Sequence, residues 1–173
     1  LARRSEAVLG GEGTERLEAA LLQPYVYSHN FTDNTWEHFD TALGHPSGPN
    51  AFRVVGEFSW LASTRFDARA RVAFERRGEN VTDELGNVVR NVGGDMQIGR
   101  RVPFDDASKD FLDGDLETDL ELGAAVTAHL SPVLWLEGDL SGRVPRSAPM
   151  DGAAAPRNTR RLQAGIVLRL NAF

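Results

Sequence analysis

Aromatic and imidazole side chains gather in one polar stretch of the chain. Flat aromatic faces stack on sugar rings, and hydroxyl, indole and imidazole groups form hydrogen bonds with sugar hydroxyls. This combination favours carbohydrate binding as the chemistry of the stretch, although packing of the same side chains against a neighbouring element explains them equally well. The candidate glycan-binding residues are Tyr25, Tyr27, His29, Trp36, His38 and His45.

Metal coordination is a second chemistry that the sequence brings into consideration. Three of the four histidines lie in or beside residues 30–50, but their spacing matches no known ligand pattern. Residues 105–121 are strongly acidic, and Asp113-Gly114-Asp115 partly resembles a calcium loop, without the glycine and the glutamate that an EF-hand requires. We therefore predict no metal site and no cofactor. A solvated loop explains the acidic residues, with divalent-cation binding as the alternative.

Catalysis and nucleic-acid binding find no support in the residue types. The chain contains no cysteine, no Gly-x-Ser-x-Gly, no phosphate-binding glycine loop and no His-Glu-x-x-His, so the common nucleophile and metalloprotease motifs are absent. The formal net charge of −6 does not fit a surface that binds nucleic acid. We predict a protein that is not an enzyme and has no nucleic-acid partner.

The elements that must position these residues are identified by an alternation of polar and apolar side chains. Successive side chains of a strand point to opposite faces, so a period of two gives one apolar and one polar face. Residues 65–77 are the clearest case, with Phe66, Ala68, Ala70, Val72 and Phe74 on one face. The opposite face carries the charges, which include Arg65, Asp67, Arg69, Arg71 and Glu75.

Five further segments show the same alternation and are predicted to be strands. They are residues 16–29, 52–62, 116–130, 134–143 and 160–173. Very short connections at residues 62–64 and 130–132 predict two tight hairpins. The remaining connections, residues 30–50, 78–115 and 144–158, are long and rich in Gly, Asn, Asp, Pro or Ala.

The connections alternate between long and short along the whole chain. Bacterial outer-membrane barrels combine short periplasmic turns with longer extracellular loops. The predicted strands are also as long as or longer than a tilted membrane-crossing strand needs, and aromatic residues gather towards strand ends as in interfacial girdles. The charged face of residues 65–77 would then face a wet lumen.

We therefore predict an all-β fold, the C-terminal segment of about six antiparallel strands of a transmembrane outer-membrane β-barrel. Residues 1–173 would form this C-terminal portion, with the three long connections outside the cell and the two tight turns in the periplasm. The expected location is the outer membrane of a Gram-negative-type bacterium. A soluble β-sandwich that binds a ligand is the alternative fold.

Four Gly-, Pro- and Asn-rich motifs in the loops go beyond this general pattern. They are Pro24-Tyr25-Val26-Tyr27-Ser28-His29, Leu43-Gly44-His45-Pro46-Ser47-Gly48-Pro49-Asn50, Arg76-Arg77-Gly78-Glu79-Asn80 and Asn91-Val92-Gly93-Gly94-Asp95. With these motifs residues 17–173 resemble the C-terminal region of the capsule assembly Wzi family. The resemblance implies an outer-membrane barrel that helps to attach capsular polysaccharide to the cell surface and behaves as a surface lectin.

Two features depart from that family. The chain is much shorter than its members, and about six strands cannot close a barrel, because bacterial barrels have about eight strands or more. The missing strands would come from an N-terminal portion, another chain or further copies of this one. In addition, strict alternation places Phe173 in phase with Arg169 and Asn171 rather than with the apolar face, unless a bulge shifts the register.

The functional hypothesis is a non-catalytic surface role in polysaccharide binding or capsule organisation. Its expected partners are outer-membrane lipid and a surface polysaccharide. A porin-like channel or transporter, in which Arg65, Asp67, Arg69 and Arg71 set solute preference, is the first alternative. A soluble binding module is the second.

Overall fold

The computed structural model of the chain describes residues 2–6, 11–28, 37–38, 41–106, 108, 110–131, 134–148 and 161–170. Every helix or strand assigned among these residues is a β-strand, which confirms the all-β prediction. Across the described ranges, no helix has the length and the apolar character needed to span a membrane. The predicted strand end at Phe173 lies outside the described residues.

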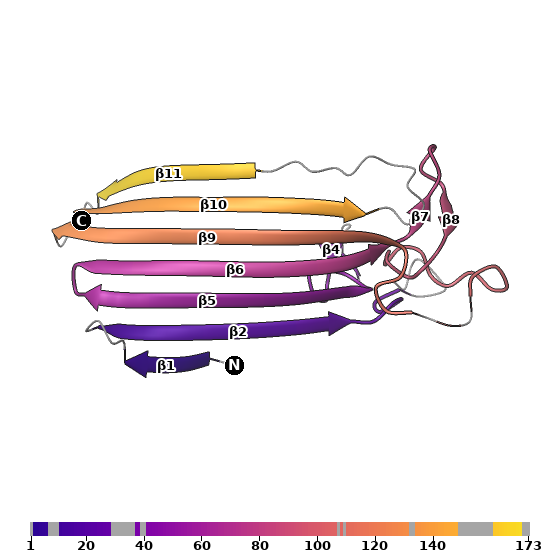
Figure 1. The fold of residues 1–173 in the computed structure, drawn as a ribbon, viewed down its shortest axis with the longest axis horizontal. Helices are drawn as coiled ribbons and strands as arrows, with labels where there is room; N and C mark the ends of the chain where they lie inside the picture. Colours follow the sequence, from indigo (N-terminus) through magenta and orange to yellow (C-terminus); the bar gives the residue numbers. More distant parts are fainter. Residues whose placement is uncertain are drawn as a thin grey trace.

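One antiparallel sheet of seven strands forms the body of the molecule, in the order β1-β2-β5-β6-β9-β10-β11 (Figure 1). Its strands are β1 (Ala2–Glu6), β2 (Glu12–Leu22), β5 (Ala51–Ser63), β6 (Phe66–Glu79), β9 (Asp115–Ser131), β10 (Leu134–Ala148) and β11 (Arg161–Leu170). Two small sheets lie between them, β3 (Glu37–His38) with β4 (Thr41–Ala42) and β7 (Val81–Thr82) with β8 (Val88–Arg90). Each long strand pairs with its neighbours along the chain, so the sheet is a simple meander.

The six expected strands are all present, and both tight hairpins are confirmed by the pairing of β5 with β6 and of β9 with β10. The first turn lies at Thr64 and Arg65, because β5 continues to Ser63 and β6 begins at Phe66. Arg65 therefore belongs to the turn, where its carbonyl oxygen accepts a hydrogen bond of 2.8 Å from the amide of His129. The strand prediction was wrong for this residue. The short strand β1 was not predicted.

Residues 25–27 form a turn instead of continuing the first long strand, which ends at Leu22. Tyr25 and Tyr27 have positive φ angles of 62° and 71°, which a strand does not allow. The amide of Tyr25 donates to the carbonyl of Gly93 at 3.0 Å, a partner from a distant part of the chain. The strand prediction failed here because three alternating residues cannot reveal such a tertiary hydrogen bond.

The third long connection is also shorter than predicted, because β10 continues to Ala148. Pro145 suggested a loop at this point, yet it pairs with Asp119 of β9. Among the described residues, β11 pairs with β10 only as far as Arg143, so residues 144–148 have no described partner strand on that side. A proline is tolerated on an edge, where its missing N–H is not needed by a second neighbour. Residues 149–160 lie outside the described part of the chain.

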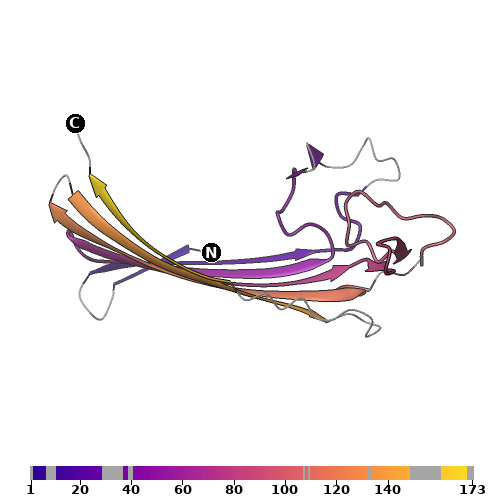
Figure 2. The same cartoon turned by 90° about the horizontal axis from the view of Figure 1, so that it is seen from above.

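The sheet is strongly twisted and curved, and the described loop segments lie at one end of it while the tight turns lie at the other (Figures 1 and 2). We call these the loop end and the turn end. The sorting follows directly from the meander, because every second connection returns to the same end of an antiparallel sheet. The second long connection runs from Glu79 to Asp115 and carries the small β7–β8 hairpin.

The two faces of the sheet differ in chemistry, as the alternation predicts. One face, the apolar face, carries Leu, Val, Phe, Ile and Ala side chains that remain exposed, among them Val72 at 48%, Leu122 at 50% and Ile166 at 81%. The strands of the sheet contact mainly their immediate neighbours, and no described element packs on this face. Charged side chains on this face include Arg76, near the end of β6, and Glu15 of β2, which lies opposite Phe58 in the middle of β5.

Burial is concentrated at and near the loop end of the sheet rather than between layers. The buried apolar residues among those described are Leu22, Ala51, Ala73 and Val92. Five polar residues are buried as well, namely Ser47, Asn50, Asn80, Asn91 and Asp105. A water-soluble domain normally buries a contiguous apolar core, whereas here the described residues bury a set of hydrogen-bonded polar groups at the loop end.

Candidate functional site

The four sequence motifs meet at the loop end and form one unit. We call this unit the loop cluster and define it as residues 23–28, 43–50, 78–80, 91–95 and 112–114. Asn50 contacts both Gly78 and Asp113, and Tyr25 contacts both Asn91 and Gly93. Segments far apart in the sequence are thus joined by direct hydrogen bonds.

Asn50 lies at the centre of the loop cluster and is completely buried. Its Nδ2 donates to the carbonyl oxygens of Gly78 at 2.9 Å and Asp113 at 3.1 Å, and its Oδ1 accepts from the amide of Leu112 at 2.7 Å. Its φ angle is 52°, a left-handed conformation that asparagine tolerates better than most residues. A single side chain therefore fixes three segments relative to one another.

Two further asparagines fix the motif at residues 91–95. The Oδ1 of Asn80 accepts from the amides of Val92 at 2.9 Å and Gly94 at 3.3 Å. The Oδ1 of Asn91 accepts from the amide of Gly93 at 3.1 Å. Gly93 has a φ of +79°, and a Cβ there would lie 2.5 Å from the ring of Tyr25. The glycine in this motif is therefore required both by conformation and by close approach.

The two tyrosines proposed for sugar binding form hydrogen bonds and packing contacts within the loop cluster. The hydroxyl of Tyr25 donates to the carbonyl of Asn91 at 2.9 Å, and the hydroxyl of Tyr27 accepts from the amide of His45 at 3.2 Å. The ring of Tyr27 packs against Gly44, where a Cβ would come within 2.3 Å of it. Both side chains are only partly exposed, so the structure gives them a clear packing role.

Of the other four glycan-binding candidates, the structure describes two. His45 is partly exposed in the loop cluster, and its Nδ1 accepts from the amide of Ser47 at 3.2 Å. His38 lies in β3. His29 and Trp36 lie outside the described residues. The structure therefore brings Tyr25, Tyr27 and His45 into one unit, and the candidates as a set stay predictions.

Asp105 stabilises the loop around residues 101–105, which follows the loop cluster in the chain. Its side chain is buried, with 2% of its surface exposed. Its carboxylate accepts from the amide of Arg101 at 2.6 Å, from the guanidinium of Arg101 at 2.8 Å and from the Nδ2 of Asn91 at 2.8 Å. Burial alone would raise the pKa of this carboxyl. The hydrogen bonds from Arg101 and Asn91, together with the charge of Arg101, outweigh burial and hold the pKa below its usual value.

Asp105→Asn is expected to loosen this loop above about pH 4, where the wild-type carboxylate is charged, because the charge-assisted hydrogen bonds to Arg101 are lost. A depressed carboxyl pKa stabilises the fold above the unfolded value of about 3.9, and this contribution disappears as pH falls through the folded value. Pepsin cleavage near Phe104 measures the loosening. The wild-type loop should become sensitive to pepsin only when the pH falls below about 3.9, and the loop of Asp105→Asn should already be sensitive above that pH.

Asp106→Asn is the matched control, because Asp106 is exposed and its backbone oxygen, not its carboxylate, accepts from Arg100. This variant should behave like the wild type. Equal cleavage of the wild type and Asp105→Asn across the whole pH range would show that the Asp105 carboxylate does not brace the loop.

The opposite side of the sheet from the apolar face, here the polar face, carries an ion-pair network across several strands. Arg71 of β6 lies between Glu57 of β5 at 3.3 Å and Glu121 of β9 at 3.1 Å. Glu121 also lies 3.7 Å from Arg53 and 4.0 Å from Arg143. The network thus joins β5, β6, β9 and β10, and alternating charges compensate one another across neighbouring strands.

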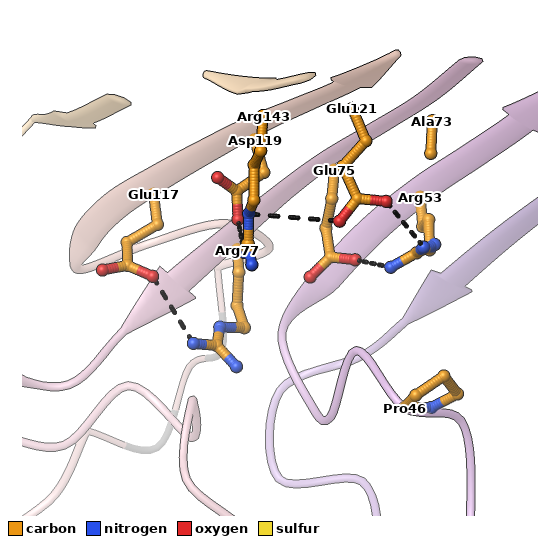
Figure 3. A pocket seen from close by; sticks show the side chains of 9 residues that line it. All are labelled: Pro46, Arg53, Ala73, Glu75, Arg77, Glu117, Asp119, Glu121 and Arg143. Carbon is orange, nitrogen blue, oxygen red and sulfur yellow. Dashed lines mark hydrogen bonds and ion pairs between the residues drawn. The ribbon is translucent and has the colours of Figure 1, made fainter. Parts of the chain in front are cut away.

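The loop cluster closes over one end of this network. Arg53 Nη1 and Ser47 Oγ both contact Glu75 Oε2, at 2.5 Å and 2.8 Å, so the segment 43–50 is tied to the polar face. A polar hollow of about 270 Å³ lies between Pro46 and the sheet. Figure 3 shows the charged side chains that line it, which are Arg53, Glu75, Arg77, Glu117, Asp119, Glu121 and Arg143.

The lumen-facing residues predicted from one strand are thus part of a larger set. Asp67, Arg69, Arg71 and Glu75 lie on the polar face of β6, whereas Arg65 lies in the turn. Their partners Arg53, Glu121 and Arg143 were not singled out from the sequence, although they share the same parity in their own strands. The strand register, which pairs Arg53 with Glu75 and Glu121 with Arg143, is what joins them.

Arg53→Met is expected to lower the free energy of unfolding by about 2 kcal/mol, because hydrogen bonds to charged groups contribute about 1.5–3 kcal/mol each. The side chains of Arg53 and Glu75 are 21% and 18% exposed, so solvent replaces the lost contact poorly. Urea unfolding measures the change. Arg69→Met is the control on the same face, since Arg69 is 70% exposed and should change stability by less than about 0.5 kcal/mol. Equal effects of both variants would contradict the role of the network.

Metal binding gains no support from the geometry of the described residues. No group of three or more His, Asp or Glu side chains among them is arranged to hold a metal ion. The acidic segment instead supplies partners for arginines, since Asp113 contacts Arg90 and Asp105 contacts Arg101.

With this geometry established, the chain was compared with known proteins. No protein-family model, curated protein or solved structure matched it. The function must therefore be argued from the sheet, the polar face and the loop cluster themselves.

Proposed function

We propose that this chain forms part of the wall of an outer-membrane β-barrel and presents its loops as a surface for a polysaccharide, as in the capsule assembly Wzi family that it resembles. The observation that carries the proposal is the uncovered apolar face, which runs across strands of 13 to 17 residues in β5, β6, β9 and β10. A tilted transmembrane strand needs about 9–11 residues.

The physical argument starts from the cost of exposing apolar side chains to water. Contiguous apolar surface on a soluble protein is normally small, and a large patch marks contact with a membrane or a partner. A soluble β-sandwich would cover this face with a second sheet, and the described residues supply none. Lipid covers such a face without a second layer, while the ion-paired polar face suits a wet lumen.

Charged side chains also occur on the apolar face. Arg76 lies near the loop end of β6, where a barrel meets the membrane interface and a charge costs much less than at the middle of the bilayer. Glu15 of β2 lies opposite Phe58, in the middle of β5, so an interfacial position does not explain it. In the proposed barrel the loop end would lie outside the cell and the turn end in the periplasm, because outer-membrane barrels combine long extracellular loops with short periplasmic turns.

The polysaccharide role is supported by the resemblance and by the loop cluster. The motifs that carry the resemblance are scattered along the sequence, yet they assemble into one hydrogen-bonded unit at the loop end. A pre-organised surface loses little entropy when it binds a ligand. The loop cluster contains the described segments on both sides of the first long loop, residues 23–28 and 43–50, and His29, Trp36 and His38 lie between these segments in the sequence.

A solute channel is the second candidate function, and one observation favours it. The segment 43–50 folds over the polar face and is tied to Glu75, so it narrows the space beside the ion-pair network. A narrowing lined by charged side chains would select solutes by size and charge. Single-channel conductance separates the candidates, because a barrel that serves as a binding surface should be nearly silent.

The experiment that tests the proposal has two parts. The protein should require detergent or lipid to stay folded and should migrate differently on electrophoresis before and after heating, as folded barrels do. Binding to isolated capsular polysaccharide is then compared for Trp36→Ala, in the first long loop, and Trp135→Ala, at the turn end. Loss of binding in the first variant alone is expected. A chain that is soluble and folded without detergent would contradict the barrel, and absence of any polysaccharide binding would contradict the surface role.

A further inference from the structure

We infer that Arg76 and Arg146 form a binding site for the phosphate group of a membrane lipid, on the apolar face at the side of the loop end. The inference rests on the proposed barrel, in which the apolar face contacts lipid. It goes beyond that proposal by assigning a ligand to one place on the face. The ligand class is a phosphorylated lipid of the outer leaflet.

Arg76, Thr118 and Arg146 lie in one row across three neighbouring strands (Figure 1). Arg76 of β6 pairs with Thr118 of β9, and Thr118 pairs with Arg146 of β10. Residues that pair directly across antiparallel strands lie on the same face of a sheet, so the row belongs to the face that carries Val72 and Leu122. Neighbouring strands are about 4.8 Å apart, which places the backbones of the two arginines about 10 Å apart. Two arginines at this spacing can contact one phosphate group from opposite sides.

The row lies directly beyond the uncharged part of the apolar face. In β10 the outward positions from Leu134 to Val144 carry no charged residue, and Arg146 is the next outward position. This run is about 34 Å long at about 3.4 Å per residue. It would rise about 24–28 Å in a strand tilted by about 35–45°, which matches the apolar band of about 25 Å of outer-membrane barrels. The arginines would therefore lie at the level of the lipid headgroups on the loop side, which is the outer leaflet in the proposed topology.

The charge of Arg76 is not compensated by the described part of the protein. Its Nε is buried and has no hydrogen-bond partner there, and no described carboxylate forms an ion pair with it. Glu15 on the same face is different, because the register places it opposite Arg3 of β1. The outward positions around Arg76 and Thr118 carry no acidic residue. They are Phe52, Phe74, Gly78, Leu116, Leu120 and Val144.

A phosphorylated lipid supplies what this row lacks. Arginine binds phosphate through paired, charge-assisted hydrogen bonds, and the hydroxyl of Thr118 is a further potential donor. The acyl chains of the same lipid would cover the apolar positions next to the row, such as Phe74 and Leu120. A free phosphate ion would make only the polar contacts. The site is therefore assigned to a lipid headgroup rather than to a soluble anion.

Lipid A binding tests the inference in the protein that carries this chain, extracted from membranes and purified in detergent. Native mass spectrometry measures its affinity for bisphosphorylated lipid A and for lipid A from which the phosphates have been removed. The wild type should bind the bisphosphorylated form at least about tenfold more tightly, a difference of about 1.4 kcal/mol in binding free energy. Arg76→Gln and Arg146→Gln should each lower this preference, and the double variant should lose it.

Arg69→Gln is the matched control, because Arg69 is an exposed arginine of β6 on the polar face, so this variant should bind lipid A like the wild type. Migration before and after heating shows whether each variant still forms a barrel, and the comparison of the two lipid forms needs only the wild type. Equal affinity of a heat-modifiable wild type for both forms, or an unchanged preference in the double variant, would overturn the inference and leave the barrel standing. Displacement of lipid A by millimolar inorganic phosphate would overturn the assignment to a lipid. A protein that is soluble and folded without detergent would overturn both the site and the barrel.

Discussion

Leu122→Arg is expected to prevent stable folding of the protein in a lipid bilayer. Leu122 lies near the middle of β9 on the apolar face, is 50% exposed and pairs with Val72 of β6 and Gly142 of β10. If this face contacts lipid, an arginine there costs about 2–4 kcal/mol at the bilayer midplane. The fraction of heat-modifiable protein formed in lipid vesicles, and its urea midpoint, measure the loss.

The control is the same charge on the polar face. Gln163→Arg places an arginine on an exposed position of β11 that faces the proposed lumen, and its effect should stay within about 0.5 kcal/mol. A soluble sheet would tolerate both substitutions, because both positions would then meet water. Equal folding of the two variants in vesicles would therefore show that the apolar face does not contact lipid.

Asn50→Ala is expected to cause the second large effect, a loss of about 4 kcal/mol from the stability of the loop end. Three hydrogen bonds disappear with the side chain, and buried partners left unsatisfied cost about 1–3 kcal/mol each. Alanine is also strained at the φ of 52° that this position adopts, by about 1–2 kcal/mol. Hydrogen exchange of the amides of Leu112 and Gly78, followed by mass spectrometry, reports the opening of the cluster.

Asn50→Gly separates the two contributions. Glycine adopts the left-handed conformation without strain, so this variant should lose only the part that the hydrogen bonds contribute. The control is Asn87→Ala. Asn87 is an exposed asparagine in the turn between β7 and β8, outside the loop cluster, so this variant should leave hydrogen exchange in the cluster unchanged. Unchanged exchange in Asn50→Ala would mean that another residue holds the loops together.

These variants also bear on the proposed function. The loop cluster is held together by hydrogen bonds of the buried side chains of Asn50, Asn80 and Asn91, with Val92 buried beside them. Under the proposed function, Asn50→Ala should therefore weaken polysaccharide binding and leave membrane insertion of the strands intact. Leu122→Arg should instead prevent the proposed barrel from inserting, so that polysaccharide binding is lost together with it.

The strands and their faces followed from the sequence. Side chains alternate along any extended backbone, so the polarity of residues 65–77 or 116–130 indicates a strand and its two faces without further information. The two hairpins followed as well, because a connection of two or three residues leaves antiparallel pairing as the available geometry. The motifs at residues 43–50 and 91–95 were visible as glycine- and asparagine-rich segments.

Only the tertiary structure determined the contacts between distant segments. The alternation at residues 25–27 indicated a strand, but hydrogen bonds with Gly93 and Asn91 hold these residues in a turn. Pro145 suggested a loop, but it pairs with Asp119 of β9 on one side, and on the other side the described part of β11 begins opposite Arg143, so no described strand needs the N–H that proline lacks. The sequence likewise placed Arg71 on a polar face, whereas the register decided that Glu57 and Glu121 lie beside it. Local periodicity depends on backbone geometry within one segment, and these outcomes depend on pairing between segments that no single stretch of sequence contains.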